Sequence, residues 1–257
     1  SISYQLYPAT PQTATTAVGS NRYYRTDYNL RKHMKRKLLL AACAVLIFCV
    51  GVRAQGATDR KMRDAGLVDV LGVDSTLRVR LMYSTEDNFM GRDVYGDLER
   101  AYLLPHFAAK LAHAQRLLRE RRPGWRLLVC DAARPISVQR YMYSLVEGTP
   151  NQVYVANGAR GGRHNYGVAV DVTLLDAAGR EVDMGTPVDF FGEEAHTGGE
   201  AALVAAGKIS AAAARNRELL RSVMREAGLV PYRREWWHYE EPMPMPEVRE
   251  RFRLLDF

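Results

Sequence analysis

The sequence predicts a single domain of the α+β class. Its 257 residues are 47% hydrophobic and 25% charged, which provides enough apolar sequence for the core of one full-sized domain. Segments with the alternating pattern of strands and segments with the apolar stripe of helices follow one another without regular alternation. Because the chain has only 3 cysteines and an ordinary composition, disulfide-stapled, collagen-like and disordered proteins are excluded.

The first half of the domain contains two expected strands and two expected helices. Residues 77–83 alternate between apolar and polar side chains, as a half-buried strand does, and lead into a polar loop. An apolar stripe predicts a helix within 98–122, which a Pro-Gly pair ends. A short apolar strand over 125–130 follows, and then a helix over 137–147, for which Ser137 is the expected N-cap.

The second half begins with the strongest strand signal of the chain. Residues 168–175 are β-branched and apolar, as a central strand is, and a turn follows them. The glycine-rich residues 192–208 are expected to form a mobile loop. A helix over 211–227 is expected to end at Gly228, and the last strand is expected over 232–239.

The N-terminal residues up to Ala54 have the composition of a leader. From Met34, three basic residues precede an apolar run and a small residue at Ala54, which is the three-part pattern of a secretory signal. The apolar run of about 15 residues is shorter than the roughly 20 that span a bilayer, so we expect cleavage and no stable membrane span in the mature chain. We expect residues 1–33 to be upstream or unstructured sequence, residues 34–54 the signal peptide and residues 55–257 the domain.

These features predict an exported protein of the periplasm or cell envelope. A lipoprotein-like box ending at Cys43 is a minor alternative, because it leaves only five apolar residues before the cysteine. The leader holds 8 of the 36 Lys and Arg residues but 1 of the 29 Asp and Glu residues, so the domain is electrically balanced and offers no footprint for nucleic acid. After cleavage Cys130 is the only cysteine, which excludes an internal disulfide. The sequence does not indicate an oligomeric state.

Two short segments place histidines beside carboxylates in apolar surroundings. His164 lies in a loop before Asp171, whose carboxylate falls within an otherwise apolar strand and is costly to bury unless a cation or several donors satisfy it. In the second segment, two tryptophans separate Glu235 from His238. Two histidines and one aspartate form a three-ligand set for zinc with an open fourth position, and Glu235 is then the candidate general base.

The spacing of the second segment leaves another interpretation open. In an ideal strand, positions 235 and 238 point to opposite faces, so both side chains reach one metal only at a strand end or a bulge. In the alternative interpretation, His164 caps a loop and His238 is a satisfied core histidine, and neither binds a metal.

Five motifs, in order along the chain, resemble signatures of the D-alanyl-D-alanine dipeptidases, the VanX-type branch of the zinc peptidases. They are YSTEDNFMG at 83–91, DAARP at 131–135, HNYGVAVD at 164–171, MGTPVDF at 184–190 and EWWH at 235–238. The resemblance implies one Zn²⁺ held by His164, Asp171 and His238, with Glu235 as the general base. We expect a small mixed or antiparallel sheet flanked by helices, with this zinc site at the edge of the sheet.

The resemblance assigns roles to three further residues. Arg134, whose guanidinium is always charged and offers a planar fork of donors, is implied to stabilise the oxyanion that forms when water attacks the peptide carbonyl. Tyr83 and Asp189 are implied to bind the free ammonium of the substrate. From the residues alone, the favoured interpretation of Arg134 is a strand-end ion pair with Asp131. The corresponding structural interpretations are a packed tyrosine for Tyr83 and a turn-capping aspartate for Asp189.

One position departs from the family pattern. The VanX-type enzymes commonly have a serine two residues before the first zinc histidine, whereas this chain has Gly162. A hydroxyl that could contact the substrate is therefore missing, and the departure concerns the choice of dipeptide rather than the metal site.

The function that the resemblance implies is zinc-dependent hydrolysis of D-Ala-D-Ala, or of close D,D-dipeptides, to free amino acids in cell-wall peptide metabolism. One alternative is a D,D-carboxypeptidase or peptidoglycan endopeptidase of the same zinc superfamily, which trims longer stem peptides. Another is a non-catalytic, zinc-stabilised wall-binding module. Glu235 and Arg134 argue against the module, because a structural zinc site needs neither a base nor an oxyanion donor.

Overall fold

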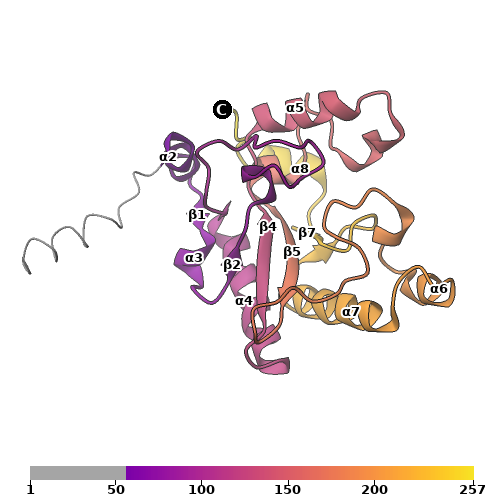
Figure 1. The fold of residues 1–257 in the computed structure, drawn as a ribbon. Coiled ribbons are helices and arrows are strands. Elements are labelled where there is room, and N and C mark those ends of the chain that lie inside the picture. Colours follow the sequence, from indigo (N-terminus) through magenta and orange to yellow (C-terminus); the bar gives the residue numbers. More distant parts are fainter. Residues whose placement is uncertain (1–55) are drawn as a thin grey trace, which may run out of the picture. The chain divides into compact units, whose positions relative to one another are not determined.

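The computed structural model describes residues 56–257, and its centre is a mixed five-stranded sheet with the order β2-β4-β5-β7-β6 (Figure 1). The strand β2 runs parallel to β4, and every other neighbouring pair is antiparallel. The strands are β2 (Arg78–Val79), β4 (Arg126–Asp131), β5 (Ala169–Leu175), β6 (Val230–Pro231) and β7 (His238–Glu240), and β1 (Val68–Asp69) pairs with β3 (Tyr102–Leu103) in a separate ladder. This arrangement confirms the α+β class and the small mixed sheet.

Two long helices cover one face of the sheet. The helices α4 (Pro105–Arg121) and α7 (Ala211–Glu226) pack against each other, and they also contact β4 and β6, respectively. The shorter helices are α2 (Ala57–Asp64), α3 (Val70–Val73), α5 (Ile136–Val146), α6 (Glu200–Ala205) and α8 (Met245–Arg251), and the 3₁₀ turns are η1 (Met82–Ser84), η2 (Pro150–Tyr154), η3 (Arg163–Tyr166) and η4 (Glu193–Ala195). None of the helices in residues 56–257 is long and apolar enough to cross a membrane.

The pleat of β5 separates the apolar core from a polar face. Val170, Val172 and Leu174 join the main core with residues of α4 and α7, and burial of each such side chain contributes about 1.5–3 kcal/mol. Because successive side chains of a strand point to opposite faces, Asp171 and Thr173 lie on the other side of the sheet. The sequence is apolar throughout β5 apart from these two residues, so it places one carboxylate on the face away from α4 and α7.

Several expected elements are shorter than the sequence pattern indicated. The helix expected within 98–122 begins only at Pro105, because the buried apolar residues before it form β3 and its flanks. The helix α5 begins at Ile136, so Ser137 is not its N-cap, and its hydroxyl instead donates to the carbonyl of Phe257 at 2.8 Å. Of the strand expected over 77–83, only Arg78–Val79 is extended, and η1 follows.

Of the elements expected in the second half of the domain, some are confirmed and others differ. The strand over 168–175 and the helix that ends before Gly228 are confirmed, and Gly228 has the left-handed φ of 84° that such an ending requires. The expected mobile loop over 192–208 instead contains η4 and α6, which is held by an ion pair between Glu200 and Arg221 at 2.5 Å. The last strand covers only His238–Glu240 of the expected 232–239. The predicted upstream segment and signal peptide lie outside the described residues.

Candidate active site

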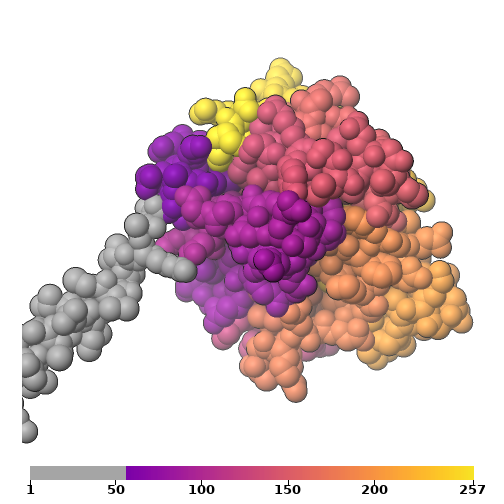
Figure 2. Space-filling view, turned by 45° about the horizontal axis from the view of Figure 1, so that its top comes forward, coloured from indigo at the N-terminus to yellow at the C-terminus, as the bar shows by residue number. Residues whose placement is uncertain are grey.

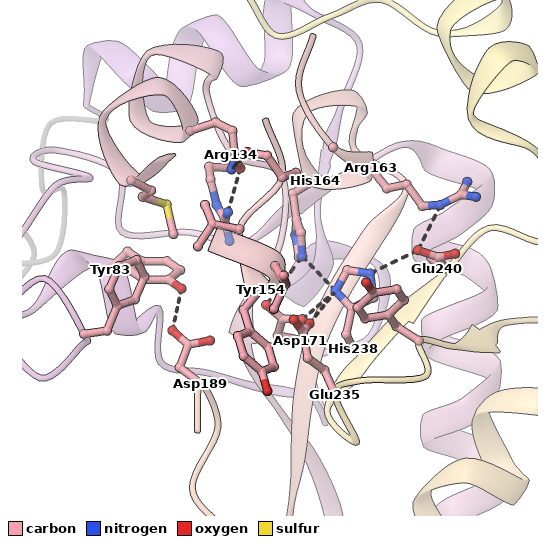
Figure 3. Close-up of a pocket in the computed structure, with 18 of the residues that line it drawn as sticks. Tyr83, Arg134, Tyr154, Arg163, His164, Asp171, Asp189, Glu235, His238 and Glu240 are labelled. Atoms are coloured by element: carbon pink, nitrogen blue, oxygen red, sulfur yellow. Dashed lines mark hydrogen bonds and ion pairs between the residues drawn. The ribbon is translucent and has the colours of Figure 1, made fainter. Parts of the chain in front are cut away.

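The predicted site residues line one pocket of about 370 Å³. Its lining includes Phe89, Tyr154 and Phe191 from three segments that are distant in sequence. Figure 2 shows purple, pink and orange parts of the chain meeting on one face of the molecule. Aromatic rings connect them, because Phe191 lies 5.2 Å from the ring of Phe89 and stacks on Tyr154 at 5.1 Å. The site is thus walled by apolar rings and lined with charged groups at its base (Figure 3).

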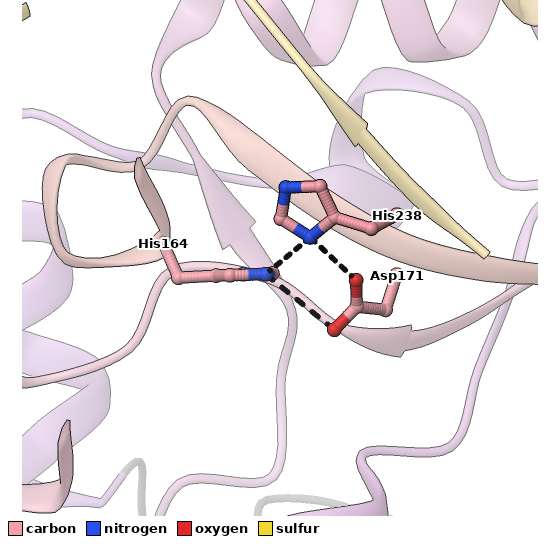
Figure 4. Close-up of side chains that lie close together, drawn as sticks. All are labelled: His164, Asp171 and His238. Carbon is pink, nitrogen blue, oxygen red and sulfur yellow. Dashed lines mark hydrogen bonds and ion pairs between the residues drawn. The ribbon is translucent and has the colours of Figure 1, made fainter. Parts of the chain in front are cut away.

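His164, Asp171 and His238 converge at the end of the sheet where β5 begins (Figure 4). Nε2 of His164 lies 3.2 Å from Nδ1 of His238 and 3.4 Å from Oδ2 of Asp171. Nδ1 of His238 lies 3.0 Å from Oδ1 of Asp171. One atom of each residue therefore points at a common centre.

Local structure explains why these three residues meet. Asp171 and His238 are direct partners in the ladder between β5 and β7, so their side chains leave the same face of the sheet. His164 reaches them because η3 ends at Tyr166 and the next residue, Gly167, turns the chain into β5 with a φ of 68°. A Cβ at Gly167 would lie 2.8 Å from Cδ2 of Leu67, so both the conformation and the space require glycine.

Hydrogen bonds behind the histidines determine which ring nitrogens are free. The carbonyl of Ala132 only accepts, so Nδ1 of His164, at 2.7 Å, carries the proton and Nε2 presents a lone pair. Oε2 of Glu240 accepts from Nε2 of His238 at 3.2 Å, so Nδ1 is the nitrogen that offers a lone pair when the ring is neutral. With both rings neutral, two lone pairs face each other beside a carboxylate. A divalent cation satisfies this arrangement and two neutral imidazoles alone do not, so the donor set fits zinc.

The charges of these groups suit a cation. Burial alone raises the pKa of Asp171, but His164 and His238 hold that pKa well below its ordinary value, so the carboxylate is ionised. Burial alone lowers the pKa of His238, but its hydrogen bonds to Asp171 and Glu240 raise it to about 10. Without a cation the ring therefore also carries a proton on Nδ1, which it donates to Asp171 at 3.0 Å, and a bound metal ion would take the place of this proton.

Glu235 lies beside this trio and outside it. It belongs to the turn that precedes β7, not to the strand itself, and Oε2 approaches Nδ1 of His238 at 3.8 Å. The difficulty that an ideal strand would separate positions 235 and 238 therefore does not arise. Burial raises the pKa of Glu235 to about 8, against a lowering effect of His238. A carboxyl with this pKa can both accept and return a proton near neutral pH.

Arg134 is buried and held in a fixed orientation. Its Nη1 donates to Gln139 at 2.8 Å and its Nη2 pairs with Asp131, whose other oxygen accepts from the hydroxyl of Tyr95. The guanidinium lies over the ring of Tyr83 at 5.0 Å, and its Nε is enclosed without a partner. The ion pair with Asp131 and a position at the pocket are thus both present, so the two sequence interpretations of Arg134 are compatible.

Tyr83 and Asp189 lie together at one end of the pocket. The hydroxyl of Tyr83 donates to Oδ2 of Asp189 at 2.5 Å; Tyr83 is buried, and Asp189 is partly buried. Burial, with the charge of Asp171, raises the pKa of Asp189 to about 7. Tyr83 is a packed residue, as its structural interpretation required, but its polar end reaches the pocket.

Gly162 also lines the pocket, where the family pattern has serine. A Cβ at this position would lie 2.8 Å from Cβ of Ala156, which is closer than side-chain carbons pack. The neighbouring segment therefore occupies the space that a serine side chain at position 162 needs.

All seven residues that the sequence singled out line this pocket, but the sequence did not indicate the residues that hold them in place. Glu240 lies two residues after His238, so it shares a strand face with it, and this spacing could have indicated a supporting carboxylate. Gln139 and the carbonyl of Ala132 carry no such signal, because only the folded chain brings them to Arg134 and His164.

The convergent His-His-Asp set, with a buried carboxyl and a buried arginine beside it, defines the site as that of a metal-dependent hydrolase. A family model described as D-ala-D-ala dipeptidase, peptidase M15, matches residues 63–253. The D-alanyl-D-alanine dipeptidase of Escherichia coli (strain K12) is 32% identical over 176 residues, which cover 68% of this chain and 84% of the relative. The D-alanyl-D-alanine dipeptidase of Enterococcus faecium is 33% identical over 187 residues, with 63% of this chain and 86% of the relative covered.

The chain therefore belongs to the M15 family of D-Ala-D-Ala dipeptidases and is a metallopeptidase. Among solved structures, that of the LdcB LD-carboxypeptidase aligns with 55% of this chain and 59% of that chain, at 13% identity and a TM-score of 0.36. A likeness this low carries no argument about fold or substrate.

Proposed function

We propose that this protein hydrolyses the peptide bond of D-Ala-D-Ala, or of a close D,D-dipeptide, with one Zn²⁺ held by His164, Asp171 and His238. The observation that carries the proposal is the meeting of these three ligand atoms beside Glu235 in one pocket of a chain from this family. When bound, zinc supplies a Lewis acid that polarises the scissile carbonyl and makes water acidic enough to lose a proton near pH 7.

The chain's own residues carry the proton and the charge. Glu235, whose pKa burial raises to about 8, takes a proton from the attacking water and returns it to the leaving amine. Arg134 donates hydrogen bonds to the oxygen on which negative charge develops, and its partners Asp131 and Gln139 hold it there in advance. The donor is thus oriented before the substrate arrives.

The pair formed by Asp189 and Tyr83 supports a preference for substrates with a free amine. The Asp189 carboxylate and the hydroxyl oxygen of Tyr83 line the pocket and are acceptors for a substrate ammonium. A peptide extended at its amino end would bring an uncharged amide against this carboxylate, which costs desolvation without an ion pair. This favours a dipeptidase over a carboxypeptidase or endopeptidase.

We also propose that the protein is exported to the periplasm or cell envelope and acts there in cell-wall peptide metabolism. The proposal rests on the signal-like pattern that runs from Met34 to Ala54. Expression from Met34 in a bacterial host, followed by mass spectrometry of the mature N-terminus, is expected to find a chain that starts at Gln55. A lipid-modified Cys43 or an uncut chain would contradict the proposal.

The function is tested by the release of free D-alanine from D-Ala-D-Ala by the zinc-loaded full chain, with Glu235→Gln measured beside it. We expect turnover by the wild type and a loss of at least about 10²-fold in the variant, because general acid–base catalysis contributes about 10²–10⁴-fold. The zinc content of the variant is measured as well. A variant that loses zinc together with activity would show that Glu235 is a ligand and not the base.

A further inference from the structure

Arg163 lies beside a proposed metal ligand but takes no part in the steps above. It is the first residue of η3, lines the pocket and has only 15% of its side chain exposed. Its Nε forms an ion pair with Oε2 of Glu240 at 2.9 Å, and the same oxygen accepts from Nε2 of His238 at 3.2 Å. Glu240 therefore holds one edge of the guanidinium, and His238 in turn holds the carboxylate of Glu240.

The other edge of this guanidinium is enclosed but unpaired. Nη1 of Arg163 is shielded from solvent and has no hydrogen-bond partner. A buried donor on a charged group is unfavourable until it meets an acceptor, and a carboxylate is the acceptor whose geometry best matches a guanidinium. Glu240 shares its charge between Arg163 and His238, so it does not supply a second acceptor for Nη1.

The two sides of the pocket carry charged groups of opposite sign. Figure 3 shows Tyr83 and Asp189 on one side of the convergent trio and Arg163, with Glu240, on the other. An acidic group at one end and a guanidinium at the other match the ammonium and the carboxylate of a zwitterionic dipeptide. The peptide bond of such a molecule lies between its two charges, as the trio lies between the two ends of the pocket.

We propose that Arg163 is a specificity-determining residue, whose guanidinium binds the terminal carboxylate of the substrate. The inference rests on the proposed dipeptidase function and extends it, because it makes the free carboxyl end a second requirement beside the free amine. Because Gly162 has no side chain, Arg163 is the nearest charged donor in the segment that precedes His164. Substrates with a neutral carboxyl end are then poor ones.

The test compares D-Ala-D-Ala with D-Ala-D-alaninamide, in which a neutral amide replaces the carboxylate. kcat/KM is measured for both substrates with the zinc-loaded full chain and with Arg163→Met. We expect the wild type to prefer the acid by about 10- to 100-fold, as a hydrogen-bonded ion pair provides. In Arg163→Met the acid loses this factor, mainly through KM, while the amide changes by less than about threefold, so the preference disappears.

Two further variants separate binding from support of the metal site. Arg221→Met removes another arginine with little exposure (11%) from an ion pair outside the pocket, and it is expected to keep the wild-type preference. Glu240→Gln keeps the guanidinium but removes the carboxylate between it and His238, so it is expected to keep the preference even where its measured zinc content falls. If Arg163→Met lowers the acid and the amide equally, Arg163 acts only through Glu240 and the proposal is overturned.

A failure of the proposed function gives a different result. If the wild type hydrolyses neither substrate, the dipeptidase function is wrong, and calorimetry of the same two compounds decides the role of Arg163 independently. Tighter binding of the acid, lost in Arg163→Met, supports carboxylate recognition. Equal binding of the acid and the amide to the wild type contradicts it.

Discussion

Asp189 holds a backbone conformation that residues other than glycine rarely adopt. Its φ is 61°, and it is the only non-glycine residue with a positive φ in the described part of the chain. Strain of this kind persists where the surrounding structure holds it in place, and it is concentrated at functional sites. Here it presents the carboxylate to the hydroxyl of Tyr83 in the lining of the pocket.

The titration of Asp189 predicts a pH dependence of substrate binding. Burial raises its pKa to about 7, so below this pH the group is neutral and cannot pair with an ammonium. We expect kcat/KM for D-Ala-D-Ala to be about tenfold lower at pH 6 than at pH 8 through this group, because kcat/KM reports the free enzyme. The measurement is the ratio of wild type to Asp189→Asn across this range. A ratio that does not change with pH would contradict the role of Asp189.

The contact between positions 162 and 156 predicts that Gly162→Ser destabilises the protein alone but much less in combination with Ala156→Gly. Gly162→Ser places a Cβ 2.8 Å from that of Ala156, so the single variant is expected to lose about 1–3 kcal/mol of stability by overpacking. Ala156→Gly removes the opposing atom, so the double variant is expected to regain most of this loss. Thermal unfolding of the four proteins in the cycle measures the coupling. Additive losses would show that the two positions do not meet.

At the scale of elements, the sequence pattern predicted secondary structure best where every residue of a segment is buried. The strand β5 is buried at all seven positions, and its β-branched run predicted it to within one residue. The region before Pro105 was assigned to a helix because β3 is as apolar as a helix stripe and too short to show an alternation. The turn that holds Glu235 was assigned to a strand because its buried aromatic residues resemble one.

The turn between η3 and β5 is the element that brings two proposed ligands together, and Gly167 is its critical residue. Gly167→Ala is expected to cost more than the roughly 1–2 kcal/mol of a left-handed alanine, because the new Cβ also meets Leu67 at 2.8 Å. Since this displaces His164 from Asp171, zinc affinity is expected to fall as well. Both are measured by thermal unfolding and by metal titration.

Gly179 provides the matched control for this change. It has a similar φ of 80°, but nothing lies within 4 Å of the position of its Cβ. Gly179→Ala is therefore expected to lose only the stability that a left-handed alanine costs and to keep the wild-type zinc affinity. Equal effects at the two positions would argue against a special role of the turn at Gly167.

At the scale of the whole molecule, the sequence predicted which residues meet in the pocket better than it predicted how they are held. His164, Asp171, Glu235 and His238 were identifiable because they form acidic and imidazole pairs in apolar surroundings. Arg134, Tyr83 and Asp189 were assigned only through the resemblance to a family pattern. The backbone carbonyl behind His164 and the amide of Gln139 were not identifiable, because long-range folding alone brings them there. The pairing of Arg163 with Glu240 was also missed, because the two residues are distant in sequence.

Metal removal is expected to destabilise the entire domain. The trio joins η3, β5 and β7, so a cation that binds only the folded state adds its binding free energy to the free energy of unfolding. At free zinc of about 100 times Kd this is about 2.7 kcal/mol, which raises Tm by roughly 5–10 °C. Calorimetry after chelation and after return of zinc measures the difference.

Two histidine variants complete this test of the metal site. His164→Gln is expected to lose stoichiometric zinc and the zinc-dependent rise in Tm. His106→Gln is expected to keep both, because His106 lies outside the pocket and contacts Glu241 and Phe252. Full zinc binding by His164→Gln would mean that the ligand set is wrong.

The most direct test of the central claim is the relative rate of hydrolysis of D-Ala-D-Ala and N-acetyl-D-Ala-D-Ala by the zinc-loaded protein. The hydrogen-bonded pair of Asp189 and Tyr83 predicts turnover of the free dipeptide and loss of at least about 10-fold in kcat/KM when acetylation removes the ammonium. Equal or faster cleavage of the acetylated compound would contradict the dipeptidase account and identify a carboxypeptidase or endopeptidase instead.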